Sequence, residues 1–251
     1  MEKYEVANTK QDSIKQGITQ ESDIEQSRTK LTGIEQRGNE QCGTRQSSGI
    51  EVQHVYKSFG AQKVLVDVNL TIPPGKSLGV VGNNGSGKTV LMKCICGFLR
   101  PDSGTIYVQG KQIGKEIDFP ENIGVIIETP GFLPNLTGYQ NLKLLAALKG
   151  RIGRQEILST IQRVGLDPKL KKPVSKYSLG MRQRLGIAQA IMENPDVLIL
   201  DEPFNGLDKA GVEQMRTLIL ELKAQGKALL LASHNAMDIE MLCDEVKEMG
   251  M

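Results

Sequence analysis

The stretch SLGVVGNNGSGKTVLMKCICGFL, residues 77–99, decides the fold of this 251-residue chain. Its first five residues form a short apolar run, which is typical of a strand buried on both faces of a parallel sheet. Residues 82–89 then match the pattern Gly-x-x-x-x-Gly-Lys-Ser/Thr, and VLMKCICGFL after them predicts a helix. A strand, a glycine-rich loop and a helix in this order predict a phosphate-binding loop in an α/β fold.

The loop contains the residue types that bind a nucleoside triphosphate. Gly85 and Gly87 let backbone N–H groups surround the phosphates, because no Cβ intervenes. Lys88 is expected to reach the β- and γ-phosphates, and the Thr89 hydroxyl to bind Mg²⁺. The nucleotide-binding residues predicted for this segment are Gly82, Asn83, Asn84, Gly85, Ser86, Gly87, Lys88, Thr89 and Val90.

The segment VLILDEP, residues 197–203, predicts the catalytic half of the same site. Asp201 lies at the end of a predicted buried strand and is expected to hold Mg²⁺. Glu202 follows it, and adjacent side chains on a strand end point in different directions. Glu202 is therefore expected to polarise the attacking water, which is typically worth about 10²- to 10⁴-fold in rate. Solvated turn residues are the alternative, but the neighbouring phosphate loop favours catalysis.

The segment KYSLGMRQRLGIAQAI, residues 176–191, predicts a second phosphate-binding element. Ser178 is a good helix N-cap, and the first turns of the helix that follows contain Gly180 and two arginines. A helix N-terminus attracts anions through its free N–H groups and its partial positive charge. An ordinary capped helix without a ligand is the alternative.

Composition restricts the class of partner. The net charge is +2, Trp is absent and aromatic residues make up 4%, so the chain is not expected to bind nucleic acid. The spacing of Cys42, Cys94, Cys96 and Cys243 fits no metal motif, so reduced thiols in a cytoplasmic protein are expected. No apolar run approaches the roughly 18–20 residues of a membrane span, so any work at a membrane needs a second chain that crosses it.

The pattern of residues changes near position 50. Residues 1–49 are rich in Gln, Ser, Thr, Glu and Gly, which predicts a disordered polar tail, with partner binding as an alternative. Residues 50–60 and 64–72 alternate apolar and polar positions and predict strands. Further buried strands are predicted at 197–200, 228–233 and 122–127. Helical periodicity dominates between about 131 and 195.

At this point residues 50–246 resemble the ATP-binding subunit of an ABC transporter, with the family's motifs in order. Gly82–Thr89 matches the Walker A motif and Val197–Asp201 the Walker B motif, followed by Glu202 at the position of the catalytic glutamate. Further matches are Phe59 in KSFG, which would stack on adenine, Tyr177–Met181 at the signature motif, NGLD with Asp208 at the D-loop, and His234 in ASHN at the switch histidine.

The resemblance implies a P-loop NTPase with a mostly parallel core sheet, an N-terminal antiparallel β subdomain and an inserted helical subdomain at about 131–195, all within residues 50–251. It implies ATP and Mg²⁺ as cofactors and ATP hydrolysis coupled to transport, with Lys88, Glu202 and His234 as catalytic residues. Two such cassettes would pair head to tail, so that Ser178 and Gly180 contact the γ-phosphate on the partner. The implied location is the inner face of the cell membrane, beside a separate permease.

Three motifs depart from the family pattern: the signature motif, the Q-loop and the D-loop. Leu179 and Met181 replace Gly and Gln in the signature motif, and Glu128 in IIETPGFLP stands where a Q-loop glutamine is usual. Glu128 can coordinate Mg²⁺ but cannot donate a hydrogen bond when ionised. Both departures resemble exporters of bacteriocins and peptide antibiotics that confer self-immunity. Lys209 replaces a usual proline, with little expected effect.

Two regions carry further expectations. PGFLPNLTGYQNL, residues 130–142, contains Phe132, Leu133 and Leu136, which are expected to be exposed in a groove for the permease, or to form a local core under the loop. The family normally continues with further strands and a Gly-Lys turn after the stretch CDEVKEMGM, and their loss would leave a sheet edge uncovered. Residues 247–251 are expected to be frayed. An ABC ATPase that acts on a macromolecule, or an ATP-binding cassette without transport activity, stay open as alternatives.

Overall fold

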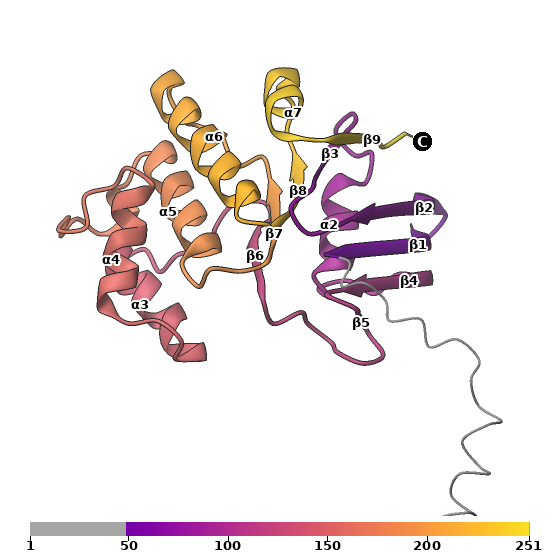
Figure 1. Ribbon diagram of the computed structural model, residues 1–251, viewed down its shortest axis with the longest axis horizontal. Helices are drawn as coiled ribbons and strands as arrows, with labels where there is room; N and C mark the ends of the chain where they lie inside the picture. Colours follow the sequence, from indigo (N-terminus) through magenta and orange to yellow (C-terminus); the bar gives the residue numbers. More distant parts are fainter. Residues whose placement is uncertain (1–48, 251) are drawn as a thin grey trace, which may run out of the picture. The chain divides into compact units, whose positions relative to one another are not determined.

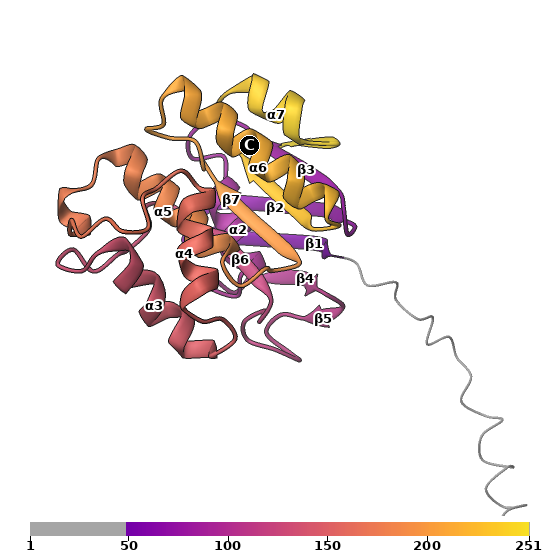
Figure 2. The ribbon, with the colours of Figure 1, turned by 60° about the vertical axis from the view of Figure 1, so that its left-hand side comes forward.

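The computed structural model describes residues 49–250 of the chain. The predicted polar tail at residues 1–49 lies outside the described residues, except for Gly49. Within residues 49–250 the strands form two sheets, one antiparallel and one parallel, and helices pack against both (Figures 1 and 2). This arrangement confirms the predicted fold class, while the domain boundaries stay a prediction.

The antiparallel sheet is built from the alternating segments that begin at Ile50. Its strand order is β2-β1-β4-β5. Positive φ angles at His54 and Asp67 mark the irregularities in the pairing of β1 with β2, where the Nδ1 atom of His54 lies 2.8 Å from Asp67 Oδ1. The strands are β1 (Ile50–Phe59), β2 (Gln62–Ile72), β4 (Ser103–Val108) and β5 (Lys111–Gln112).

The parallel sheet positions the functional segments. Its strand order is β6-β7-β8-β3-β9, and every pair in it is parallel. The carboxyl ends of these strands therefore lie at one edge, which is where ligands bind in open α/β sheets. The strands are β3 (Ser77–Val81), β6 (Ile123–Ile126), β7 (Val197–Asp201), β8 (Ala228–Ala232) and β9 (Glu245–Glu248).

The helices begin at residues with good capping chemistry. Thr137 accepts a hydrogen bond from the backbone N–H of Gln140, Ser178 from that of Met181, and Asp208 from that of Gly211. The helices are α2 (Lys88–Ile95), α3 (Gly138–Lys149), α4 (Arg154–Arg163), α5 (Leu179–Ile191), α6 (Lys209–Ala224) and α7 (Ala236–Leu242), with a 3-10 turn η1 (Val174–Lys176). Helices α3, α4 and α5 gather away from the antiparallel sheet (Figures 1 and 2).

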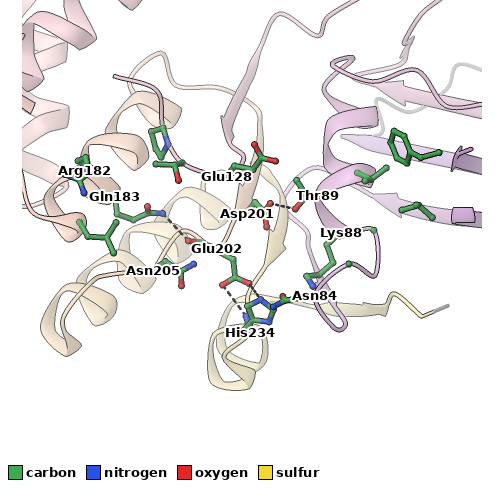
Figure 3. A pocket seen from close by; sticks show the side chains of 18 residues that line it. Asn84, Lys88, Thr89, Glu128, Arg182, Gln183, Asp201, Glu202, Asn205 and His234 are labelled. Carbon is green, nitrogen blue, oxygen red and sulfur yellow. Dashed lines mark hydrogen bonds and ion pairs between the residues drawn. The ribbon is translucent and has the colours of Figure 1, made fainter. Parts of the chain in front are cut away.

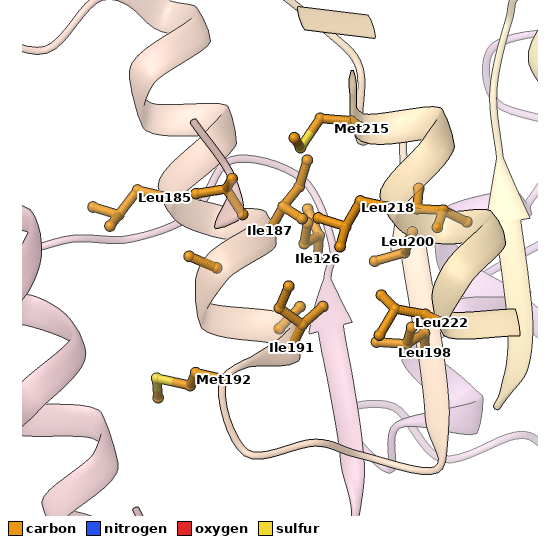
Figure 4. Close-up of a cluster of buried hydrophobic side chains, with 14 of the residues drawn as sticks. Ile126, Leu185, Ile187, Ile191, Met192, Leu198, Leu200, Met215, Leu218 and Leu222 are labelled. Atoms are coloured by element: carbon orange, nitrogen blue, oxygen red, sulfur yellow. The ribbon is translucent and has the colours of Figure 1, made fainter. Parts of the chain in front are cut away.

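Strand β7 separates two hydrophobic clusters. Leu198 and Leu200 face one cluster, which helices α5 and α6 complete (Figure 4). Val197 and Ile199 face the other cluster, which contains helix α2 and both sheets. Because successive side chains of a strand point to opposite faces, a strand buried on both faces must be apolar throughout. The continuous run VLIL is explained by this double burial.

The loop before helix α3 departs from its expected exposure. Leu133 is exposed, but Phe132 packs against the first cluster and Leu136 is half-buried. The buried Asn141 side chain holds this loop, because its Oδ1 accepts a hydrogen bond from the Leu133 N–H and its Nδ2 donates to the Thr137 carbonyl. Leu133 is therefore exposed as expected, whereas Phe132 and Leu136 are only partly exposed, and the packing of Phe132 is closer to the alternative of a local core.

The C-terminal segment also corrects an expectation. Lys247 and Glu248 belong to β9, which pairs with β3, and Met249 is buried with its N–H donating to the Val81 carbonyl at 2.8 Å. Residues 247–250 are therefore not frayed, and β9 covers the edge of β3. Met251 lies outside the described residues.

The cysteines of the described segment are free thiols. Cys94 and Cys96 are buried on and beside helix α2, and burial raises the pKa of Cys94 to about 11 and of Cys96 to about 12. Cys243 is half-buried, and burial raises its pKa to about 12. Cys42 lies outside the described residues.

None of the helices in residues 49–250 is both long and apolar enough to span a bilayer.

The double burial of β7 predicts a large stability effect. Leu198 is 1% exposed, so Leu198→Ala should lower the free energy of unfolding by about 2–5 kcal/mol through lost contacts and a cavity. Leu148 is 82% exposed on helix α3, so Leu148→Ala should change the free energy of unfolding by less than about 0.5 kcal/mol. Urea unfolding monitored by circular dichroism measures both, and equal effects would contradict the assigned burial.

Candidate active site

One cavity of about 620 Å³ opens at the carboxyl edge of the parallel sheet (Figure 3). It brings together residues from six separate parts of the chain. Predicted site residues that line it are Phe59, Asn84, Gly85, Gly87, Lys88, Thr89, Val90, Glu128, Asp201, Glu202 and His234. Lining residues that were not among the predicted site residues are Val64, Thr129, Pro130, Leu179, Arg182, Gln183 and Asn205.

The glycine-rich loop wraps around its own lysine. Lys88 is 8% exposed, and its Nζ donates to the carbonyl oxygens of Gly82 at 2.7 Å and Asn83 at 3.1 Å. Gly87 has a φ of 96°, and a Cβ there would lie 2.9 Å from the Val64 carbonyl oxygen, so this position requires glycine. The loop therefore holds an ammonium group at the cavity wall, and within residues 49–250 this group forms hydrogen bonds to backbone carbonyls but no ion pair.

Three predicted loop residues do not line the cavity. Gly82 and Asn83 are absent from the cavity wall, and their carbonyls accept hydrogen bonds from Lys88. Ser86 is buried, and its Oγ has no hydrogen-bond partner among the described residues. A buried hydroxyl without a partner is costly, so Ser86 fits a loop whose polar groups are completed by a bound anion.

Thr89 and Asp201 form an oxygen pair at the floor of the cavity. The Thr89 hydroxyl donates to Asp201 Oδ2 at 2.7 Å, and Asp201 is buried at the end of β7 (Figure 3). Mg²⁺ prefers such hard oxygen ligands and is usually held by one or two carboxylates together with substrate phosphates. The donor set therefore fits Mg²⁺ bound with a nucleotide.

Glu202 points away from this pair and toward His234. Its Oε1 lies 3.3 Å from His234 Nε2, and its Oε2 accepts from the His234 backbone N–H at 3.4 Å (Figure 3). The Glu202 backbone is anchored on both sides, because its N–H donates to the Ala232 carbonyl and its carbonyl accepts from Gln183 Nε2. Burial raises the pKa of Glu202, and the charge and N–H of His234 oppose that rise.

A buried ion pair holds the turn that carries His234. The Arg216 guanidinium on helix α6 contacts the Asp238 carboxylate on helix α7, with its Nε 2.9 Å from Oδ1. The other Asp238 oxygen accepts from the Ser233 hydroxyl at 2.7 Å, and that hydroxyl accepts from the Asn235 N–H. The residues on both sides of His234 are therefore fixed by a buried network, while His234 itself is half exposed.

Phe59 lies at the end of β1 and presents an exposed ring to the cavity. The Lys57 ammonium lies 5.6 Å from the centroid of that ring, within the range of a cation–π contact. Lys57 also forms an ion pair with Asp102 at 2.7 Å. The hydrogen bonds from Lys57 and from the Ser58 N–H lower the pKa of Asp102.

Glu128 follows β6 with a φ of 58°, and its carboxylate lies 2.6 Å from Lys93 Nζ. The ion pair with Lys93 did not emerge from the sequence. The sequence did contain a signal that Lys93 lies on the side of the metal site. Lys93 follows Thr89 by four residues, and residues at this spacing share one face of a helix.

Ser178, Gly180 and Asp208 do not lie in the main cavity. They line a separate hollow of about 340 Å³ beside the start of helix α5. The Ser178 hydroxyl caps its own helix by accepting from the Met181 N–H at 3.2 Å. Leu179, Arg182 and Gln183 of the same helix do line the main cavity. Ser178 and Gly180 thus face a different hollow from the phosphate loop of the same chain, although other residues of helix α5 reach the main cavity.

Comparison with known proteins identifies the family. The ABC transporter family profile matches residues 65–205. An uncharacterised ABC transporter ATP-binding protein of Bacillus subtilis, YybJ, is 42% identical over 201 residues, which are 80% of this chain and 92% of that protein. The bacitracin transport ATP-binding protein BcrA of Enterococcus faecalis is 41% identical over 199 residues, which are 78% of this chain and only 65% of BcrA.

Further comparisons agree on the family and the fold. The lantibiotic transport ATP-binding protein SrtF of Streptococcus pyogenes is 38% identical over 78% of this chain and 84% of its own length. A solved ATP-binding subunit of an ABC transporter superposes with a TM-score of 0.72 at 30% identity, covering 80% of this chain and 85% of that chain. The structure of a dimeric bacterial ABC transporter cassette, MJ0796, shares the fold at 22% identity and a TM-score of 0.72, over 80% of this chain and 94% of that chain.

The phosphate loop, the Thr89–Asp201 pair and these matches lead to one conclusion: the chain belongs to the ABC transporter family as an ATP-binding cassette, a family that hydrolyses ATP to drive transport.

Proposed function

We propose that this chain binds ATP with Mg²⁺ and hydrolyses it as the energy-supplying subunit of a transporter whose membrane-spanning permease is a separate chain. The observation that carries the proposal is the shared cavity, where the phosphate loop and the Glu202 carboxylate face one space. A loop that only binds nucleotide needs no second carboxylate there, so its presence favours hydrolysis.

The binding roles follow from the donors at the cavity wall. When ATP binds, the Lys88 ammonium donates to the β- and γ-phosphates in place of the Gly82 and Asn83 carbonyls. The N–H groups of the loop surround the same phosphates. Phe59 stacks on the adenine ring. Thr89 and Asp201 hold Mg²⁺, with Glu128 as a further ligand; when bound, the ion neutralises charge on the phosphates.

The hydrolytic role belongs to Glu202. Its carboxylate accepts a proton from the attacking water, and the elevated pKa makes it a better proton acceptor than an ordinary glutamate. His234 lies against Glu202 and holds that carboxylate in place through its backbone N–H and its imidazole.

We further propose that two copies of the chain pair head to tail. The start of helix α5 and Asp208 line a hollow separate from the chain's own phosphate loop. In such a pair Ser178 and Gly180 would reach the γ-phosphate held by the partner copy, where a helix N-terminus stabilises negative charge.

The transported compound is proposed to be an antibiotic peptide or a similar amphipathic molecule, exported through the permease. Support comes from the names of two relatives, which cite bacitracin and lantibiotic transport. Further support comes from Glu128, Leu179 and Met181, which differ from the usual family motifs in the way described for such exporters. The chain is then peripheral at the cytoplasmic face of the membrane.

The permease contact is proposed at a small apolar groove next to the active site. The groove has a volume of about 210 Å³ and is lined by Phe98, Val125, Ile127 and Gly186, among others. Thr129 and Pro130 line both this groove and the main cavity. A permease seated there would therefore contact the segment that carries Glu128.

The ATPase proposal is tested at Glu202. Glu202→Gln should lower kcat by about 10²- to 10⁴-fold, because the amide cannot accept the proton of the attacking water. ATP binding, measured by calorimetry, should persist. Glu240→Gln makes the same chemical change at an exposed position of helix α7 and should leave kcat unchanged. Equal phosphate release by the Glu202→Gln and wild-type proteins would refute Glu202 as the base.

The pKa of Glu202 predicts the pH dependence of hydrolysis. The working base is ionised, so kcat/KM should be maintained above the pKa of Glu202 and fall as pH drops through it. Because burial raises this pKa, the acid limb should lie above the ordinary range of a glutamate. His234→Gln removes a group that lowers the pKa, so the limb should move to still higher pH. A wild-type limb in the ordinary glutamate range would contradict the assignment.

The permease groove is tested by charge insertion. Phe98 is 60% exposed, and Phe98→Glu should reduce recovery of the chain in membranes that contain a co-expressed permease, because a carboxylate would be desolvated in the contact. ATPase activity of the isolated chain should be retained. Leu220→Glu introduces the same charge at an exposed position of helix α6 and should leave recovery unchanged. Equal recovery of both variants would place the contact elsewhere.

A further inference from the structure

We propose that Lys93 is a positioning residue that competes with the nucleotide's metal ion for the Glu128 carboxylate. This inference rests on the proposed function, since it concerns how ATP and Mg²⁺ bind to the same cavity. Lys93 lies in the last turn of helix α2, the helix that begins at the phosphate loop. Its Nζ lies 2.6 Å from Glu128 Oε1.

Two polar contacts connect the same face of α2 to neighbouring strand ends. Thr89 donates to Asp201 at the end of β7, and Lys93, one helical turn later, binds Glu128 just after β6. Strands β6 and β7 pair in parallel, with Ile126 opposite Leu200. The two carboxylates therefore lie at adjacent strand ends, with Asp201 paired to a hydroxyl that suits a metal site and Glu128 paired to a cation.

The Lys93–Glu128 pair is accessible to exchange. The Glu128 side chain is 64% exposed and that of Lys93 is 34% exposed, so water can replace either partner when they separate. Exposed ion pairs are weak for this reason. Glu128 also lines the main cavity together with Thr89 and Asp201, so its carboxylate can serve the ion pair or the metal.

The competition has a specific consequence for nucleotide binding. Without Mg²⁺, the Lys93 ammonium neutralises Glu128 and reduces the repulsion between this carboxylate and the phosphates of ATP. With Mg²⁺, the ion must draw Glu128 away from Lys93. Lys93 therefore strengthens the binding of free ATP and weakens the binding of Mg-ATP. As a result, the two dissociation constants differ less than they would without Lys93.

The role of Lys93 depends on the charge at position 128. A glutamine there is uncharged and has no need of a neutralising partner. Lys93 should therefore be dispensable in a Glu128→Gln background, whereas a purely structural lysine would matter equally in both backgrounds.

The test is the dissociation constant of ATP, measured by calorimetry in EDTA and in Mg²⁺, using the full chain with Glu202→Gln to prevent turnover. Lys93→Met should raise the ratio of the EDTA value to the Mg²⁺ value by about threefold to fivefold, the size expected of one partly exposed charge pair. Lys93→Arg keeps the charge and should keep the ratio. In the Glu128→Gln background, Lys93→Met should leave the ratio unchanged.

The outcomes separate this inference from the proposed function. An unchanged ratio for Lys93→Met, or the same change in the Glu128→Gln background, would overturn the role of Lys93 while ATP binding stands. Failure of the reference protein to bind ATP at all would instead refute the proposed function. Thermal melting checks that each variant is folded, and Lys93→Gln serves as a second neutral variant should the methionine variant not fold.

Discussion

The parallel pairing of β3, β6, β7 and β8 is the constraint on which the site depends. Because these strands run in one direction, the segments that follow them emerge at a single edge. The phosphate loop follows β3, Glu128 follows β6, Asp201 ends β7, and His234 follows β8. Asn84 and His234, which lie 150 positions apart in the chain (234 − 84), thus line one cavity.

The buried interior keeps that edge rigid. Strand β7 lies between two hydrophobic clusters, so it is held from both faces at the point where it delivers Asp201 and Glu202. The turn after β8 is fixed differently, through the buried pair of Arg216 and Asp238. Breaking such a pair leaves an uncompensated buried charge, which is strongly destabilising. Apolar packing therefore positions the carboxylates, and a polar network positions the histidine beside them.

Much of this organisation is predictable because it depends on local sequence. The glycine-rich loop, the run VLIL with its acids, and the Ser178 cap are each contained in a few residues, and each has the predicted local structure. Contacts between segments that are distant in the sequence were harder to predict. The packing of Phe132 depends on the cluster beside it, the order of residues 247–250 depends on pairing with β3, and the Lys93–Glu128 contact joins helix α2 to the segment after β6. Contacts of this kind depend on two segments together, and the only local signal among them was the four-residue spacing of Thr89 and Lys93 on one helix.

The two thiols beside the phosphate-loop helix give the chain a built-in chemical reporter. A cysteine reacts with alkylating agents as the thiolate, and burial raises the pKa of Cys94 and Cys96, which lowers their thiolate fraction at neutral pH further. Both lie in the hydrophobic cluster between helix α2 and the two sheets. An alkylating agent therefore reaches them only when this cluster opens locally. The labelling rate of Cys94 and Cys96 therefore reports local opening of the ATP-binding core, and it can be compared with and without nucleotide. No probe has to be introduced.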